Sequence, residues 1–275
     1  MQPRLLRDQE PLVHAQQRTD WRDHVQFTAI VVGAAIDGHE VPMRVALARL
    51  MANQDTIADH TASQARLNGK AFIRDELART LHEHISLALA VVNNLVRVLR
   101  PASALDANYD LKFMYYEKVT RWMREKMQAY MPIFEAARRG STPSDADREA
   151  FKRATENVRL NAVSFLADRG QQLQWTIGSR DLNTIVHEAE TAVESIEHWY
   201  RNALEVAEVL SSLTRGDKPA SLKYFAGLMY THIEQLTAEA LNYYFRRYPA
   251  WIAAIDESNR HIELLADVVA QAVIN

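Results

Sequence analysis

The sequence predicts an all-α fold, a large up-and-down bundle of about eight helices. Glycine and proline, which most often interrupt helices, number only eight each among 275 residues, and most of them fall between segments of helical periodicity. An arginine followed by a glycine closes three of these segments, at positions 139–140, 169–170 and 215–216. A cation is favoured at the negative end of a helix, and glycine readily adopts the left-handed conformation that ends one. We therefore expect a chain of helices.

The start and stop signals give the order of the elements. Pro42, Pro219 and Pro249 fit the first turn of a helix, where a missing N–H group costs nothing. Ser144 is a good N-cap for the fifth helix. Pro132 lies inside the fourth helix and should kink or break it, because its ring collides with the preceding turn. The predicted helices span residues 16–36, 42–67, 70–100, 106–138, 144–169, 180–214, 218–247 and 249–273.

Short loops between these helices favour antiparallel packing in one domain. The intervals between the three arginine–glycine stops are unequal, so a tandem-repeat solenoid is not expected. No linker rich in proline, glycine or serine divides the chain, and residues 16–275 are predicted to form a single helical domain, with helices long enough for an elongated bundle. Residues 1–15 are predicted to be a poorly ordered N-terminal arm.

Composition excludes several classes of site. The chain has no cysteine, which excludes disulfides, thiolate metal sites and thiol catalysis, and which is compatible with a reducing cytoplasm. The formal net charge is -3, from 32 basic and 35 acidic side chains, so general attraction to nucleic acid is not expected. The composition is rich in arginine and alanine, a bias typical of many bacteria. We expect a bacterial, cytoplasmic protein.

The longest apolar run without a charge is too short to span a membrane. It covers Val25 to Ile36, 12 residues, whereas a membrane-spanning helix needs about 20. We expect this segment to be a buried helix and the protein to have no stable membrane insertion. An alternative is the soluble form of a helical membrane-active protein that exposes this segment.

Carboxylate and histidine side chains are densest in the sixth predicted helix. Most of them lie opposite an apolar stripe on a helical wheel, so this cluster is expected to be a solvated face and not a metal site. Its members are His187, Glu190, Glu194, Glu197 and His198.

Two other histidines fall inside apolar faces and are expected to be buried. His84 lies among leucine, alanine and valine residues at helical spacing, and His232 lies on a similar face with Glu239 two turns further along. One interpretation is that both are core histidines whose ring nitrogens bond neighbouring polar groups. The other is that His84, His232 and Glu239 meet in the interior and hold a metal ion or a haem, because a buried neutral imidazole is a good ligand.

The fourth predicted helix is apolar over more than one face and therefore needs additional cover. The cover is another helix of the same chain, another subunit or a ligand, and we favour a protein interface because methionine and aromatic surfaces suit adaptable contacts. The residues predicted to bind a partner are Phe113, Tyr116, Trp122, Met123, Met127 and Tyr130.

The sequence thus predicts a helical protein that binds another protein or assembles with itself through the aromatic and methionine-rich helix. A first alternative is a metal- or haem-dependent helical enzyme that uses His84, His232 and Glu239, and the membrane-active protein is a second. The sequence identifies no cofactor and contains no catalytic motif such as a nucleophile elbow or a phosphate-binding glycine loop.

Overall fold

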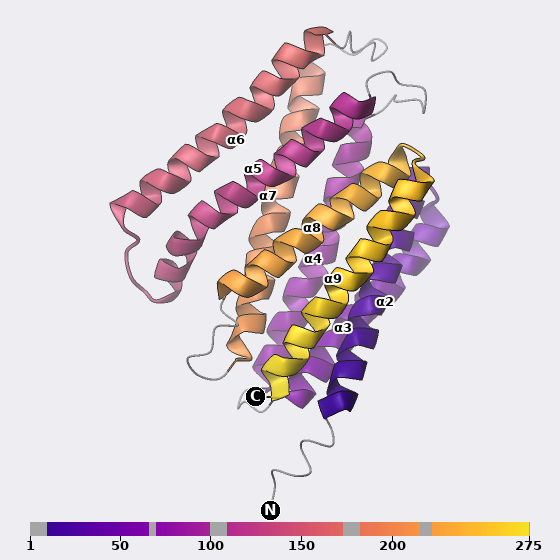
Figure 1. Cartoon of the computed structure of the whole chain (residues 1–275), viewed down its shortest axis with the longest axis vertical. Coiled ribbons are helices and arrows are strands. Elements are labelled where there is room, and N and C mark those ends of the chain that lie inside the picture. Colours follow the sequence, from indigo (N-terminus) through magenta and orange to yellow (C-terminus); the bar gives the residue numbers. More distant parts are fainter. Residues whose placement is uncertain (1–9, 66–69, 100–108, 173–181, 215–221, 275) are drawn as a thin grey trace, which may run out of the picture. The chain divides into compact units, whose positions relative to one another are not determined.

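The computed structural model describes residues 10–65, 70–99, 109–172, 182–214 and 222–274, and within them the chain is all-α, as predicted. Eight helices and no strand occur in these residues (Figure 1). The helices are α2 (Glu10–Asp37), α3 (Glu40–Gln64), α4 (Lys70–Leu99), α5 (Tyr109–Arg138), α6 (Asp145–Gln172), α7 (Leu182–Ser212), α8 (Leu222–Tyr244) and α9 (Tyr248–Ile274).

The three predicted arginine–glycine stops have different outcomes. Helix α5 ends at Arg138, and Gly140 follows with a φ of 63°, which confirms the first stop. The second stop is wrong, because α6 continues through Gly170 to Gln172. Glycine inside a helix costs only about 1 kcal/mol relative to alanine, which a helix can tolerate. Gly216 lies outside the described residues.

Two further predictions concern the course of α5 and the start of α2. Helix α5 passes through Pro132 and continues to Arg138, so this proline does not break the helix. Helix α2 begins at Glu10, so residues 10–15 of the predicted arm are helical. The ring of His14 bonds the carboxylate of Asp267 at 2.9 Å and ties this first part of α2 to α9. Residues 1–9 of the predicted arm lie outside the described residues.

The chain forms two compact units. Unit 1 comprises residues 1–92 and 202–275, and unit 2 comprises residues 93–201. Both boundaries fall inside long helices, since α4 and α7 each contain residues of both units. A division inside a helix leaves no proline-, glycine- or serine-rich linker in the sequence, so composition does not reveal it.

In unit 1, α2 packs against both α3 and α9, and α8 packs against α9. Polar contacts show that α2 and α9 are antiparallel, because Arg18 near the start of α2 bonds Asp267 and Arg22 bonds Glu263, nearer the start of α9. One core cluster of this unit joins three helices through the buried side chains of Val31, Ala46, Leu50 and Ile85.

The apolar segment from Val25 to Ile36 is part of this interior, as predicted. Val25, Val31 and Ile36 are buried, while Ile30 is exposed. In the described part of the chain, no helix combines the length and the apolarity needed to cross a membrane.

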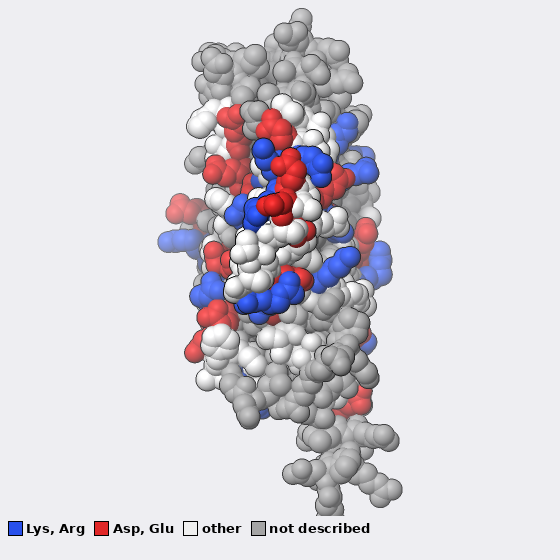
Figure 2. Space-filling model, turned by 90° about the vertical axis from the view of Figure 1, so that its left-hand side faces the viewer, with Lys and Arg blue, Asp and Glu red and all other residues white. Residues whose placement is uncertain are grey.

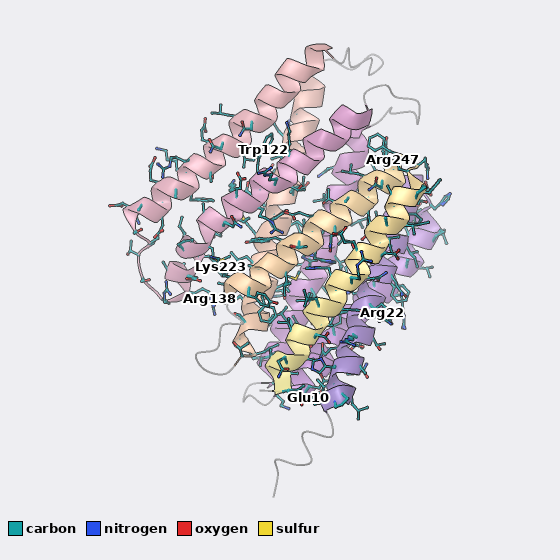
Figure 3. All side chains as sticks on the ribbon, viewed as in Figure 1. Glu10, Arg22, Trp122, Arg138, Lys223 and Arg247 are labelled. Carbon is teal, nitrogen blue, oxygen red and sulfur yellow. The ribbon has the colours of Figure 1, made fainter. Side chains whose placement is uncertain are left out.

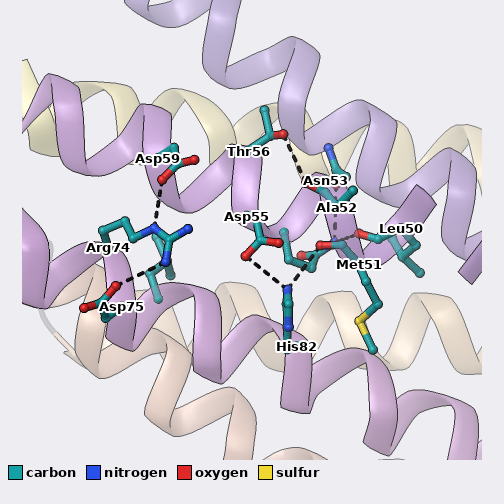
Figure 4. A network of polar contacts seen from close by, with 12 residues as sticks. Leu50, Met51, Ala52, Asn53, Asp55, Thr56, Asp59, Arg74, Asp75 and His82 are labelled. Atoms are coloured by element: carbon teal, nitrogen blue, oxygen red, sulfur yellow. Dashed lines mark hydrogen bonds and ion pairs between the residues drawn. The ribbon is translucent and has the colours of Figure 1, made fainter. Parts of the chain in front are cut away.

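Polar contacts join α3 to α4 along the surface of unit 1 (Figure 4). The Arg74 guanidinium on α4 bonds the carboxylates of Asp59 at 2.8 Å and Asp75 at 3.2 Å. About two turns further along α4 the ring of His82 contacts Asp55 of α3 at 3.4 Å and the Met51 carbonyl oxygen at 3.1 Å. These bonds fix which face of α3 turns toward α4.

In unit 2, α5 packs against α6. The predicted cap of α6 is present, because the backbone N–H of Asp147 donates to the hydroxyl oxygen of Ser144 at 3.1 Å.

The face of the molecule drawn in Figure 2 shows acidic and basic side chains side by side without a large area of either sign. This mixture agrees with the nearly balanced charge of the sequence.

Candidate functional site

Three buried histidines meet inside unit 1. His24 of α2, His84 of α4 and His232 of α8 are each at most 1% exposed. The Nε2 atoms of His24 and His232 lie 3.4 Å apart, and the ring centroids of His84 and His232 lie 6.0 Å apart with their planes inclined by only 21°. We call these three residues the histidine cluster.

Helical periodicity explains the burial of all three side chains, although only two were predicted from the sequence. His84 lies on the same face as buried Leu77 and Leu81, and His232 lies on the face of buried Phe225. Sequence analysis missed His24, because its four-residue spacing from Asp20 resembles the acid–histidine pairs that are common on exposed helices. The available signal was its position three residues after Trp21, which is also buried.

Two side-chain amides hold the outer edges of the histidine cluster. The Nδ1–H group of His84 donates to Oδ1 of Asn202 at 2.9 Å, and the Asn202 amide donates to the carbonyl oxygen of Thr80 at 3.1 Å. On the other side the Nε2 amide of Gln54 donates to Nδ1 of His24 at 3.0 Å and to the Leu50 carbonyl oxygen at 2.9 Å.

These bonds assign the protons of the imidazole rings. Because Nδ1 of His24 accepts from Gln54, its proton is on Nε2, and this nitrogen donates to Nε2 of His232. The proton of His232 is then on Nδ1, a buried atom that has no hydrogen-bond partner within the described residues. The three rings therefore form a neutral cluster that links α2, α3, α4, α7 and α8.

Burial keeps the rings uncharged. Loss of hydration lowers the pKa of His24 to about 3, with a further contribution from His84, and lowers the pKa of His84 to about 4. The pKa of His232 is also lowered well below its usual value, first by burial and then by His24, His84 and His261. At neutral pH each ring is a neutral donor and acceptor.

The described polar contact of Glu239, which was predicted to hold a metal with His84 and His232, is with a serine of α9. Glu239 lies seven positions after His232, about 10 Å along α8, and the Glu239 carboxylate accepts a hydrogen bond from the Ser258 hydroxyl of α9. Burial raises the pKa of Glu239 to about 7, against the effect of Ser258. Among the described residues, no group of three or more histidine, aspartate or glutamate side chains has an arrangement that could hold a metal ion. The amide contacts of His84 are those of a core histidine.

The predicted partner-binding residues of α5 are partly covered by the chain itself. Met123 and Met127 are fully buried, while Trp122 and Tyr130 are half-buried. Figure 3 labels Trp122 on α5. The side chains of Phe113 and Tyr116 lie outside the described residues. Other residues of the same chain therefore bury the two methionines. This is the first of the three kinds of cover considered from the sequence, a helix of the same chain, another subunit or a ligand.

A charged contact lies next to these methionines in unit 2. Lys126 donates to the Glu197 carboxylate at 2.7 Å, and Arg201 donates to the same carboxylate at 2.8 Å. Burial alone would raise the pKa of Glu197, but the hydrogen bonds and charges of Lys126 and Arg201 outweigh it, and this pKa is lowered. The Arg201 guanidinium also lies 5.2 Å from the ring centre of Tyr130.

The rest of the α7 acidic cluster is solvated, as predicted. His187, Glu190, Glu194 and His198 are all exposed. Glu197 is the exception, because it turns toward Lys126 of α5.

An exposed apolar face on α3 was not anticipated from the sequence. Val41 is 61% exposed and Val45 is 68% exposed, and the next residues on this face, Ala48 and Ala52, are exposed as well. We call these four residues the α3 stripe. The signal was present in the segment from Val41 to Ala52, which has only two charged residues and is apolar on two sides of the helix.

The opposite side of the same segment is covered within unit 1. Ala46 and Leu50 belong to the buried cluster, and Met43, Leu47 and Met51 pack against it. The α3 stripe therefore lies on the outer side of a helix whose inner side already supplies the core.

Comparison of the chain with models of protein families, with curated proteins and with solved structures finds no match.

Proposed function

We propose that this protein acts by binding protein, and that the α3 stripe is its interface. The observation that carries the proposal is the exposure of Val41 and Val45 in line with Ala48 and Ala52. Covering apolar surface is favourable by roughly 25 cal/mol for each Å² removed from water, and rows of exposed apolar side chains often mark interaction sites. Arg44 and Arg49 border the stripe, and arginine is common in interfaces.

This proposal keeps the predicted class of function and changes the predicted location. The sequence pointed to α5, but Met123 and Met127 are buried there, whereas Val41 and Val45 of α3 are accessible. Of the predicted α5 side chains that the structure describes, Trp122 and Tyr130 are half-buried and therefore the most accessible. We retain a bacterial cytoplasm as part of the proposal, since the cysteine-free composition is compatible with it.

A photo-cross-linking experiment tests the proposal. The photoreactive residue p-benzoylphenylalanine replaces Val45, and, as a matched control, it replaces Glu257 on the exposed face of α9. We expect irradiation of cells that produce these variants to give one defined protein adduct at position 45 and none at position 257. Equal yields of adduct at the two positions, or none at position 45, would show that the α3 stripe is not an interface.

A further inference from the structure

In two rings of the histidine cluster, the nitrogen that carries no proton already accepts a hydrogen bond. Nδ1 of His24 accepts from the Gln54 amide at 3.0 Å, and Nε2 of His232 accepts from Nε2 of His24 at 3.4 Å. A proton added to either nitrogen would point at the hydrogen atom of its present donor, since both nitrogens of a charged imidazole are donors. Protonation of either ring therefore breaks a hydrogen bond between two helices.

Among the described residues, no acidic side chain is placed to stabilise a charge on His24 or His232. Asp20 lies one turn before His24 on α2, but its carboxylate accepts from His60 of α3 at 2.8 Å. Glu239 lies two turns after His232 on α8 and accepts from a serine of α9. A charge on either ring would thus be buried without a counter-ion, which is costly.

The other groups that face these rings also disfavour a charge. Asn202 of α7 is uncharged and bonds His84 of α4. Burial lowers the pKa of His232, and His24, His84 and His261 of α9 lower it further, because each of these rings would repel a protonated His232 when it is charged itself.

Unit 2 contains no comparable cluster. The two histidines of this unit, His187 and His198, are exposed. Burial of Glu197 in unit 2 is outweighed by the hydrogen bonds and charges of Lys126 and Arg201, so the pKa of Glu197 is lowered. This carboxylate therefore keeps its charge at pH 5, where a histidine of an unfolded chain is mostly protonated.

Glu239 of unit 1 opposes the histidines. Burial raises its pKa to about 7, above the unfolded value of 4.5, so acid stabilises unit 1 through this carboxyl. Between pH 8 and pH 5 it lowers the equilibrium constant for opening of unit 1 about 70-fold. His24 and His84, with folded pKa values of about 3 and about 4, each raise that constant about 30-fold. The two histidines outweigh the carboxyl about tenfold, and His232 acts in their direction.

We infer that the histidine cluster is an acid-sensitive switch of unit 1, and that below about pH 6 its protonation separates α2 from α8 while α5 and α6 of unit 2 stay packed. His24 lies directly before the apolar segment Val25 to Ile36, in which Val25 and Val31 are at most 3% exposed. Opening therefore exposes apolar surface of α2 to solvent. The α3 stripe takes no part in this switch.

Hydrogen exchange of the full-length protein, measured by mass spectrometry at pH 8, 6.5 and 5, tests the switch. Protection factors are referred to the unfolded chain at the same pH, which removes the direct effect of pH on exchange. From pH 8 to pH 5 the protection factor of residues 25–36 should fall by at least ~10-fold. Residues 119–131 of α5, which include the buried Met123 and Met127, should change by less than ~3-fold.

A matched pair of variants assigns the effect to the histidine cluster. His24→Gln should reduce the ratio of the protection factors of residues 25–36 at pH 8 and pH 5 about 30-fold, because one ring no longer takes up a proton. His39→Gln changes an exposed histidine of unit 1 and should leave the ratio unchanged.

Three results would overturn the switch. Equal losses of protection in residues 25–36 and 119–131 would mean that acid unfolds the whole chain. Unchanged protection of residues 25–36 would mean that the rings take up no proton, and an unchanged ratio for His24→Gln would place the effect elsewhere. If His24→Gln does not fold at pH 8, the comparison of the two segments in the natural chain still decides.

Discussion

His24 and His232 come together through their Nε2 atoms at 3.4 Å, although 208 residues separate them in the chain. Neither ring carries a charge at neutral pH, and the buried Nδ1 of His232 has no hydrogen-bond partner among the described residues. A polar cluster of this kind contributes to a specific arrangement of helices only while its rings stay neutral. The stability of unit 1 should therefore depend on pH.

The histidine cluster should make the protein acid-sensitive. In the folded state the pKa values of His24 and His84 are about 3 and about 4, whereas the unfolded chain has values near 6.5. The unfolded state therefore binds more protons below pH 6.5, so the stability is fully present above that pH and is lost as the pH falls toward the folded values. Each ring should lower the free energy of unfolding by about 2 kcal/mol at pH 5 relative to pH 8. Urea unfolding at pH 5, 6, 7 and 8 measures the loss.

A variant separates this effect from other titrating groups. His24→Gln should remove about 2 kcal/mol of the difference between the unfolding free energies at pH 8 and pH 5. Exposed His198→Gln should leave the difference unchanged. The measured quantity is the difference between the unfolding free energies at pH 8 and pH 5. It therefore does not depend on how stable the variant is at pH 8. Equal pH dependence of the natural chain and His24→Gln would contradict a buried neutral His24.

Glu239 should have the opposite pH dependence. Its folded pKa of about 7 lies above the unfolded value of 4.5, so the folded state binds more protons between these values, and its contribution is present below pH 4.5 and lost as the pH rises through 7. Glu239→Gln should therefore raise the unfolding free energy by about 3 kcal/mol at pH 8 and by less than about 1 kcal/mol at pH 5. The glutamine oxygen can still accept the Ser258 hydroxyl. A variant that is less stable than the natural chain at pH 8 would argue against a carboxylate that is costly to ionise.

Removal of Lys126 should destabilise unit 2. The side chains of Lys126 and Glu197 are only 6% and 19% exposed, so Lys126→Met leaves a largely buried carboxylate with Arg201 as its remaining cation. We expect a loss of about 1–3 kcal/mol in the free energy of unfolding. Exposed Lys152→Met on α6 is the matched control and should change it by less than about 0.5 kcal/mol. Similar losses for the two variants would mean that the contact with Glu197 contributes little.

Gly33 on α2 should accept alanine but not a larger side chain. A Cβ atom at Gly33 would lie 3.4 Å from Cζ of Tyr243, an ordinary contact, and alanine favours the helix by up to about 1 kcal/mol. Gly33→Leu would displace the Tyr243 ring, whose hydroxyl donates to Asp37 at 2.5 Å. Thermal unfolding should show Gly33→Ala at least as stable as the natural chain and Gly33→Leu clearly less stable. Gly227→Ala, where a Cβ atom meets nothing within 4 Å, controls for helix propensity.

Part of the candidate site could be read from local pattern. His84 and His232 were predicted to be buried because apolar residues flank them at helical spacing, and both are buried. The pattern could not identify their neighbours. His24 completes the cluster, but the residues around it do not clearly predict that it is buried. Glu239 shares a face with His232, but its carboxylate accepts a hydrogen bond from Ser258.

The sequence by itself determined that this chain is helical and where most of its helices begin and end, because periodicity, caps and stops act over a few neighbouring residues. Only the tertiary structure decided which helix faces are covered. Helix α3 is apolar on two sides, and contacts with residues distant in sequence cover Leu50 but leave Val45 exposed. Similarly, the structure buried Met127 of α5, which local pattern had marked for a partner. The burial of a side chain depends on segments that can be hundreds of residues away in the sequence. The pattern of a single helix does not show which of its faces those segments will cover.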